Sequence, residues 1–129
     1  SIVAGRLPLH RSATGLALLS QCSAEVVAQY HRAAWVPDAA GDPAALTATA
    51  ERFAADLAVF ARRGYAVQRE RIDQGTGGVA VPLKVPPGQR GAALGTVLPL
   101  AEMRDADLPA IVQTLRVAGH GISRALGAL

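Results

Sequence analysis

The sequence predicts an α+β fold in which helices pack against one antiparallel sheet. The middle of the chain, residues 65–100, holds segments of strand-like composition, and segments with apolar residues at helical spacing lie on either side. Short runs that contain glycine or proline separate the strand-like segments from one another. No internal repeat or linker is visible, so the 129 residues are expected to form one unit with a single core.

The amino-terminal third predicts an edge strand, two short helices and a loop. Residues 1–9 are apolar and contain Pro8, which is typical of an edge strand that runs into a turn. Ser12 or Thr14 can cap a helix that ends near Leu19, and Ser23 can cap a second helix over residues 24–34. Residues 35–42 hold the proline, aspartate and glycine residues of a loop.

A longer helix is predicted between Asp42 and Gly64. Asp42 and Pro43 supply an N-cap and a first-turn proline, and Gly64 follows two arginines as a stop signal. Apolar residues recur between them at spacings of three and four, at Leu46, Ala50, Phe53, Leu57 and Phe60.

The strand-like segments are residues 65–72, 78–85 and 91–100, and they predict a three-stranded antiparallel meander. From Asp105 or Asp107 the chain is expected to be helical as far as Gly127. Gly119 and Gly121 are expected to weaken the middle of this helix. Its predicted apolar stripe consists of Leu108, Ile111, Val112, Leu115, Ile122, Ala125 and Leu126.

Composition argues against several functions. The net charge of +3 is small and the arginines are scattered, whereas a DNA-reading domain concentrates positive charge on one face. Aromatic residues make up 4% of the chain, so stacking on nucleic-acid bases is not expected. Cys22 is the only cysteine, which excludes an internal disulfide. No membrane helix or signal peptide is visible, and a cytoplasmic location is predicted.

Four segments carry a resemblance to a known family. Residues 6–19 (RLPLHRSATGLALL), 64–83 (GYAVQRERIDQGTGGVAVPL), 84–99 (KVPPGQRGAALGTVLP) and 121–127 (GISRALG) resemble the C-terminal effector-binding domain of IclR-type bacterial transcriptional regulators in order and spacing. The resemblance covers nearly the whole chain. It implies a curved antiparallel sheet of GAF or PAS type, with a small-molecule pocket between its concave face and a flanking helix.

The resemblance also implies what the chain would do. Residues 1–129 would be a single, partial effector-binding domain, and the winged helix-turn-helix that binds DNA would lie before Ser1. The domain would bind a small carboxylate or aromatic acid and would self-associate as a dimer or tetramer. It would contact DNA only through that separate domain, and it would not be an enzyme.

Pocket residues follow from the resemblance position by position. Ala13 and Thr14 would lie where a helix start can bind a carboxylate. The remaining positions would line the sheet face and are Gln68, Thr76, Gly78, Gly95 and Val97. Gly78 replaces a frequent cysteine, and Gly95 and Val97 replace frequent serines. These departures predict a larger or more apolar effector, with the two glycines leaving room for a ring.

Other polar residues better fit structural roles. His10, His31 and His120 form no pair at metal-binding helical spacing, so no metal or cofactor is predicted, and His10 is expected to stabilise a turn. Glu70 and Asp73 could form an acid–base pair but better fit a solvated turn.

The remaining candidate functional residues also have ordinary structural explanations. The GTGG run at residues 75–78 precedes a strand and not the helix of a phosphate loop. Ser12 and Thr14 can either contact a ligand or serve only as helix caps, and Cys22 fits a small buried apolar residue. Two alternatives to the sensor stay open: a GAF-like small-molecule enzyme, and a dimerisation module that has lost ligand binding.

Overall fold

The computed structural model describes residues 9–34, 50–69 and 75–129. The edge strand predicted over residues 1–9 lies outside these ranges except for Leu9, which belongs to a 3-10 turn. The predicted loop after residue 34 and the Asp42–Pro43 helix start also lie outside them. Glu70 and Asp73 lie outside them as well.

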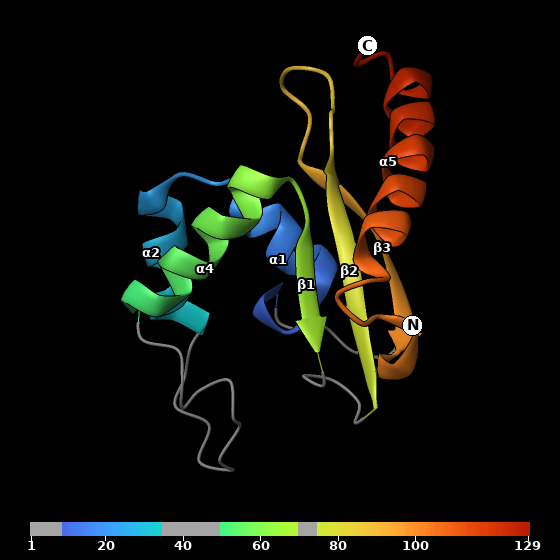
Figure 1. The fold of residues 1–129 in the computed structure, drawn as a ribbon. Coiled ribbons are helices and arrows are strands. Elements are labelled where there is room, and N and C mark those ends of the chain that lie inside the picture. Colours follow the sequence, from blue (N-terminus) through green and yellow to red (C-terminus); the bar gives the residue numbers. More distant parts are fainter. Residues whose placement is uncertain (1–8, 35–49, 70–74) are drawn as a thin grey trace, which may run out of the picture.

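The structure has three layers, with the sheet in the middle (Figure 1). The 3-10 turn η1 (Leu9–Arg11) leads into α1 (Ala13–Ser20), which packs on one face of the sheet with α2 (Ala24–Ala34) and α4 (Ala50–Arg63) beside it. After the sheet, the short turn η2 (Leu100–Glu102) leads to α5 (Leu108–Ala125), which covers the opposite face. The predicted α+β class is confirmed.

The sheet is the predicted antiparallel meander of β1 (Ala66–Arg69), β2 (Thr76–Leu83) and β3 (Ala92–Pro99), in the order β1-β2-β3. Gln68 lies opposite Gly78, which lies opposite Val97 in the next strand. The neighbouring row on the same face runs from Ala66 through Ala80 to Gly95. Because strand residues alternate between faces, both rows face α1 and the odd-numbered residues of β2 face α5.

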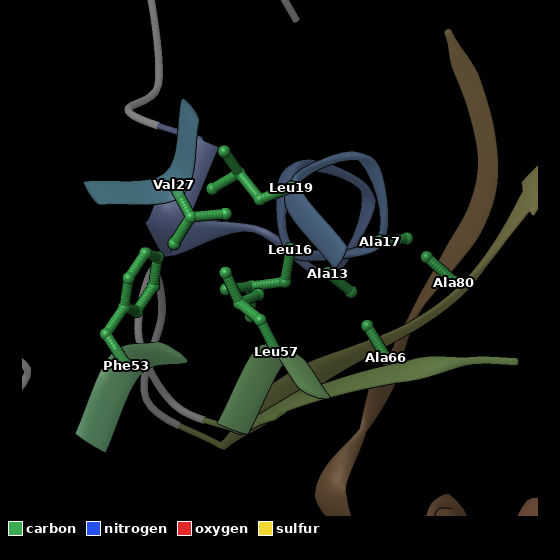
Figure 2. Close-up of a cluster of buried hydrophobic side chains, with 9 residues drawn as sticks. All are labelled: Ala13, Leu16, Ala17, Leu19, Val27, Phe53, Leu57, Ala66 and Ala80. Atoms are coloured by element: carbon green, nitrogen blue, oxygen red, sulfur yellow. The ribbon is translucent and has the colours of Figure 1, made fainter. Parts of the chain in front are cut away.

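The core on the α1 face is built from alanine, leucine and valine side chains together with Phe53 (Figure 2). Ala17 of α1 points toward Ala80 of β2, while Leu16 and Leu57 meet between α1 and α4. Alanines at this contact let the helix approach the sheet closely. The buried cluster consists of Ala13, Leu16, Ala17, Leu19, Val27, Phe53, Leu57, Ala66 and Ala80.

The core on the α5 face corrects the predicted stripe of that helix. Leu108, Val112 and Leu115 are buried as expected, but the stripe continues through Gly119 and Ser123. Ile122 and Leu126 are instead 38% and 42% exposed. A β-carbon at Gly119 would stand 2.8 Å from Leu83 Cδ2, so this glycine is the point of close approach between α5 and β2.

The capping serines and the helix-ending glycines lie where the sequence predicts them. The Ser12 hydroxyl accepts a hydrogen bond from the Gly15 amide at 3.0 Å, and the Ser23 hydroxyl accepts one from the Val26 amide at 3.2 Å. Gly64 and Gly127 adopt positive φ angles of 83° and 80° after α4 and α5.

The sequence also predicts the roles of two single side chains, His10 and Cys22, and the prediction for Cys22 is wrong. His10 is buried and its Nδ1 lies 2.9 Å from the Tyr30 hydroxyl, in agreement with a role in stabilising the turn. Cys22 was expected to be buried and is exposed, because it follows the last turn of α1 on the surface. Among the described residues, no helix combines the length and apolarity needed to cross a membrane.

Candidate functional site

A cavity of about 130 Å³ lies between the start of α1 and the sheet. Six of the seven predicted pocket residues line it: Ala13, Thr14, Gln68, Gly78, Gly95 and Val97. Thr76 lies on the same face of β2 as Gly78, two residues before it, and does not line the cavity. Val97 is 73% exposed and therefore lies at the rim, where the cavity meets solvent along β3.

Two further residues line the cavity. Ser12 was expected as a helix cap or a ligand contact, and it holds the cap position while also lining the cavity. Thr96 was not predicted. It lies between Gly95 and Val97 in β3, so strand alternation directs its side chain to the opposite face and the sequence gives no signal for it.

The two sheet glycines do not leave the room that the sequence suggested. A β-carbon at Gly95 would stand 2.7 Å from Thr14 Cγ2, and a β-carbon at Gly78 would stand 3.0 Å from the Ala13 β-carbon. The space freed by the glycines is therefore taken up by the first turn of α1. The expectation of extra space for a ring at these positions was wrong, because the helix settles closer to a sheet that has no side chains there.

The remaining volume limits what the cavity can hold. Ligand pockets usually measure about 300–1,000 Å³, whereas an engineered apolar cavity of about 150 Å³ in another protein binds benzene. A cavity of about 130 Å³ is thus suited to one small ring or a short acid.

The start of α1 supplies hydrogen-bond donors to this cavity. The helix begins at Ala13, so the first backbone amides have no partner in the preceding turn. Only the Gly15 amide is capped by Ser12. The aligned peptide dipoles add a partial positive charge of about half a unit at this end. The Thr14 hydroxyl lies 3.4 Å from the Ser12 hydroxyl at the same place.

Gln68 supplies a second, independent donor. Its side chain is 5% exposed and lines the cavity from the sheet side. Its Nε2 atom has no hydrogen-bond partner within the described part of the chain. A buried amide without a partner costs about 1–3 kcal/mol, so an acceptor atom placed in the cavity would relieve that cost.

The lining residues offer binding but no acid–base chemistry. None of them has a charged or titratable side chain, so the two hydroxyls of Ser12 and Thr14 have no base among them to activate a nucleophile. Within residues 9–34, 50–69 and 75–129, no three His, Cys, Asp or Glu side chains gather as a possible metal site.

Comparison with known proteins places the chain in a family. The family model described as the C-terminal part of the bacterial transcriptional regulator IclR matches residues 1–124. No match was found among curated protein sequences.

Solved structures agree with this match. An IclR homolog from Microbacterium hydrocarbonoxydans, solved with 4-hydroxybenzoate, is 32% identical over 100% of this chain and 50% of its own, with a TM-score of 0.75. The Agrobacterium tumefaciens repressor BlcR is 22% identical over 98% of this chain and 51% of its own, with a TM-score of 0.82.

A third structure is the inducer-binding domain of a PobR double mutant from Acinetobacter, in complex with 3-hydroxybenzoic acid. It is 21% identical over 92% of this chain and 68% of its own, with a TM-score of 0.69. At these identities BlcR and PobR support the fold alone. The chain spans about half the length of the first regulators that it matches. It belongs to the IclR family of bacterial transcriptional regulators and corresponds to their C-terminal domain.

Proposed function

We propose that this chain is the effector-sensing domain of an IclR-type regulator, and that the cavity between α1 and the sheet binds a small aromatic or other organic carboxylate. The observation that carries the proposal is the buried Nε2 of Gln68, which has no hydrogen-bond partner among the described residues and lines the same small cavity as the first turn of α1. A carboxylate supplies acceptors for both groups of donors, and the helix dipole favours its negative charge.

One relative supports the chemical class. The Microbacterium homolog, 32% identical over the whole chain, was solved with 4-hydroxybenzoate. This is a single-ring acid, which agrees with a cavity of about 130 Å³. We therefore favour a one-ring or short-chain acid over the larger effector that the glycines suggested. Gly78 and Gly95 would set the depth of the pocket by bringing α1 close to the sheet.

In the whole regulator, the effector would alter operator binding by a separate winged-helix domain. A ligand can do this only if it binds two arrangements of the protein with unequal affinity. We propose that the chain self-associates as a dimer or tetramer, which would join the DNA-binding domains to one another. A regulator of this kind would act in the cytoplasm. Of the alternatives, the small-molecule enzyme gains no support, because none of the cavity-lining side chains is titratable.

Calorimetric titration of the 129-residue chain with 4-hydroxybenzoate, 3-hydroxybenzoate and short dicarboxylates tests the proposal. We expect at least one acid to bind, and the corresponding neutral amide to bind at least about tenfold more weakly because it lacks the charge that the helix start favours. Gln68→Met should weaken acid binding by about tenfold, since it removes a hydrogen bond to a charged group.

Gln113→Met is the matched control, because Gln113 is an exposed residue of α5 far from this cavity along the fold. It should leave binding unchanged. Sedimentation velocity at micromolar concentration tests self-association. A folded chain that neither binds any acid nor self-associates would refute the sensor assignment. Self-association without binding would favour a dimerisation module that has lost its effector.

A further inference from the structure

A second cavity lies on the other face of the sheet, between β2 and the carboxyl-terminal half of α5. Its volume is about 190 Å³, larger than the cavity under α1. Val81 and Leu83 of β2 line its sheet side, and Gly119 and Ser123 line its helix side. Gly119 lines the cavity at the close approach between α5 and β2, where a β-carbon would stand 2.8 Å from Leu83 Cδ2.

Ser123 gives the cavity a buried polar group. The residue is 3% exposed, yet it lies on a helix face that otherwise packs apolar side chains against the sheet. No hydrogen bond joins its hydroxyl to another residue within the described ranges. Because Ser123 lines the cavity, its hydroxyl is placed to donate a hydrogen bond to a polar atom that enters there.

The rim of the cavity is basic. Lys84, Arg116 and His120 line it, and no lining side chain is acidic, although Leu129 also lines it and carries the terminal carboxylate of the 129-residue chain. One amino group of the Arg116 guanidinium donates to the Arg63 carbonyl at 2.9 Å, which anchors the guanidinium at the end of α4. Its other N–H groups remain available for an anion. None of the ion pairs found among the described residues involves these three side chains.

We propose that this cavity is a second binding site, for a short-chain organic carboxylate. The carboxylate would lie at the rim between Arg116 and Lys84 and accept a hydrogen bond from Ser123. The alkyl chain would pack against Val81 and Leu83. Because the sheet separates this site from the cavity under α1, occupation of one does not require the other, and the proposal stands apart from the effector site proposed above.

A two-dimensional NMR titration of the 129-residue chain with sodium butanoate, against sodium chloride at equal ionic strength, tests this site. We expect butanoate but not chloride to shift the backbone amides of Leu83, Lys84, Gly119 and Ser123. Ser123→Ala should weaken the affinity by about tenfold, as for a hydrogen bond to a charged group. Lys84→Gln should weaken it by about threefold, as for an exposed charge.

Two control variants show whether butanoate binding is specific to this cavity. Arg124→Gln removes an exposed positive charge from the same helix outside the cavity and should leave the affinity unchanged. Gln68→Met alters the cavity under α1 and should leave the shifts at Leu83 and Ser123 in place. The proposal is overturned if butanoate leaves these amides unshifted, if chloride shifts them equally, or if Arg124→Gln weakens binding as much as Ser123→Ala does. Loss of the shifts in Gln68→Met would also overturn it.

Discussion

The side-chain methyl group of Thr14 lies directly over Gly95, with 2.7 Å between Thr14 Cγ2 and the place that a β-carbon of residue 95 would occupy. This contact limits how far α1 stands from the sheet, and hence the depth of the cavity that both residues line. On the other face of the sheet, Gly119 lies at a similar close approach, between α5 and β2.

Replacing Gly95 should disturb both stability and binding. Gly95→Ala should lower the free energy of unfolding by about 1–3 kcal/mol, because the added methyl overlaps Thr14 and also crowds Ala80 and the Val79 carbonyl. Thr14→Ser in the same chain removes the overlapping methyl and should recover part of the loss in a double-mutant cycle measured by urea denaturation.

Gly121→Ala is the control for this pair. A β-carbon at Gly121 would meet nothing within 4 Å, and the residue lies inside α5. Alanine there should keep or raise the free energy of unfolding, by up to about 1 kcal/mol from helix propensity. Equal stability of Gly95→Ala and Gly121→Ala would contradict the close docking of α1.

The buried side chain of Gln68 should stabilise the complex with an acid and destabilise the protein without ligand. Gln68→Met keeps a similar shape and removes the buried Nε2 group, which has no hydrogen-bond partner among the described residues, so the free energy of unfolding without ligand should rise by about 1–3 kcal/mol. The same replacement should weaken acid binding. Thermal unfolding with and without 4-hydroxybenzoate measures both changes, and a fall in the stability of the free variant would show that the amide is already satisfied.

The two capping serines, Ser12 and Ser23, should differ in their effect on acid binding. Ser12→Ala and Ser23→Ala each remove one cap hydrogen bond, at the starts of α1 and α2, and each should cost about 0.5–2 kcal/mol of stability. Of these two serines, Ser12 lines the cavity under α1 and Ser23 does not. Acid binding measured by calorimetry should therefore weaken in Ser12→Ala and stay unchanged in Ser23→Ala. Equal effects on binding would mean that α1 has no special role in it.

Asp107 should contribute to acid sensitivity. The side chain of Arg104, followed by its backbone N–H, donates hydrogen bonds to Asp107 and holds the pKa of this carboxyl below its ordinary value. A carboxyl whose folded pKa is lowered contributes stability above its unfolded pKa, about 3.9, and loses it as the pH falls through the folded value. Asp107→Asn should thus be slightly less stable than the parent at pH 7, and the difference should vanish below that lower folded pKa.

Denaturation of both chains across the acid range measures this difference. Glu102→Gln serves as the control, since Glu102 is exposed and forms no ion pair within the described ranges. A gap between Asp107→Asn and the parent that persists at the lowest pH would rule out the carboxyl as its source.

Local signals in the sequence were enough for the order and type of the described elements. Apolar spacing and cap residues predict α1, α2 and α5, and strand composition with intervening turns predicts the meander. These features depend on residues close together in the chain, such as Ser12 with Gly15 or Ser23 with Val26. The resemblance to a family added the pocket positions, six of which line one cavity.

Only the tertiary structure decided how closely the layers approach, because this distance depends on which small residues meet across the chain. The sequence alone shows glycine at positions 78, 95 and 119, but it does not show that Ala13, Thr14 and Leu83 come up against them. For the same reason the sequence could not reveal the buried Ser123, the exposed Ile122 or the unpartnered amide of Gln68. Burial is a property of what packs against a residue, and those neighbours lie far away in the sequence.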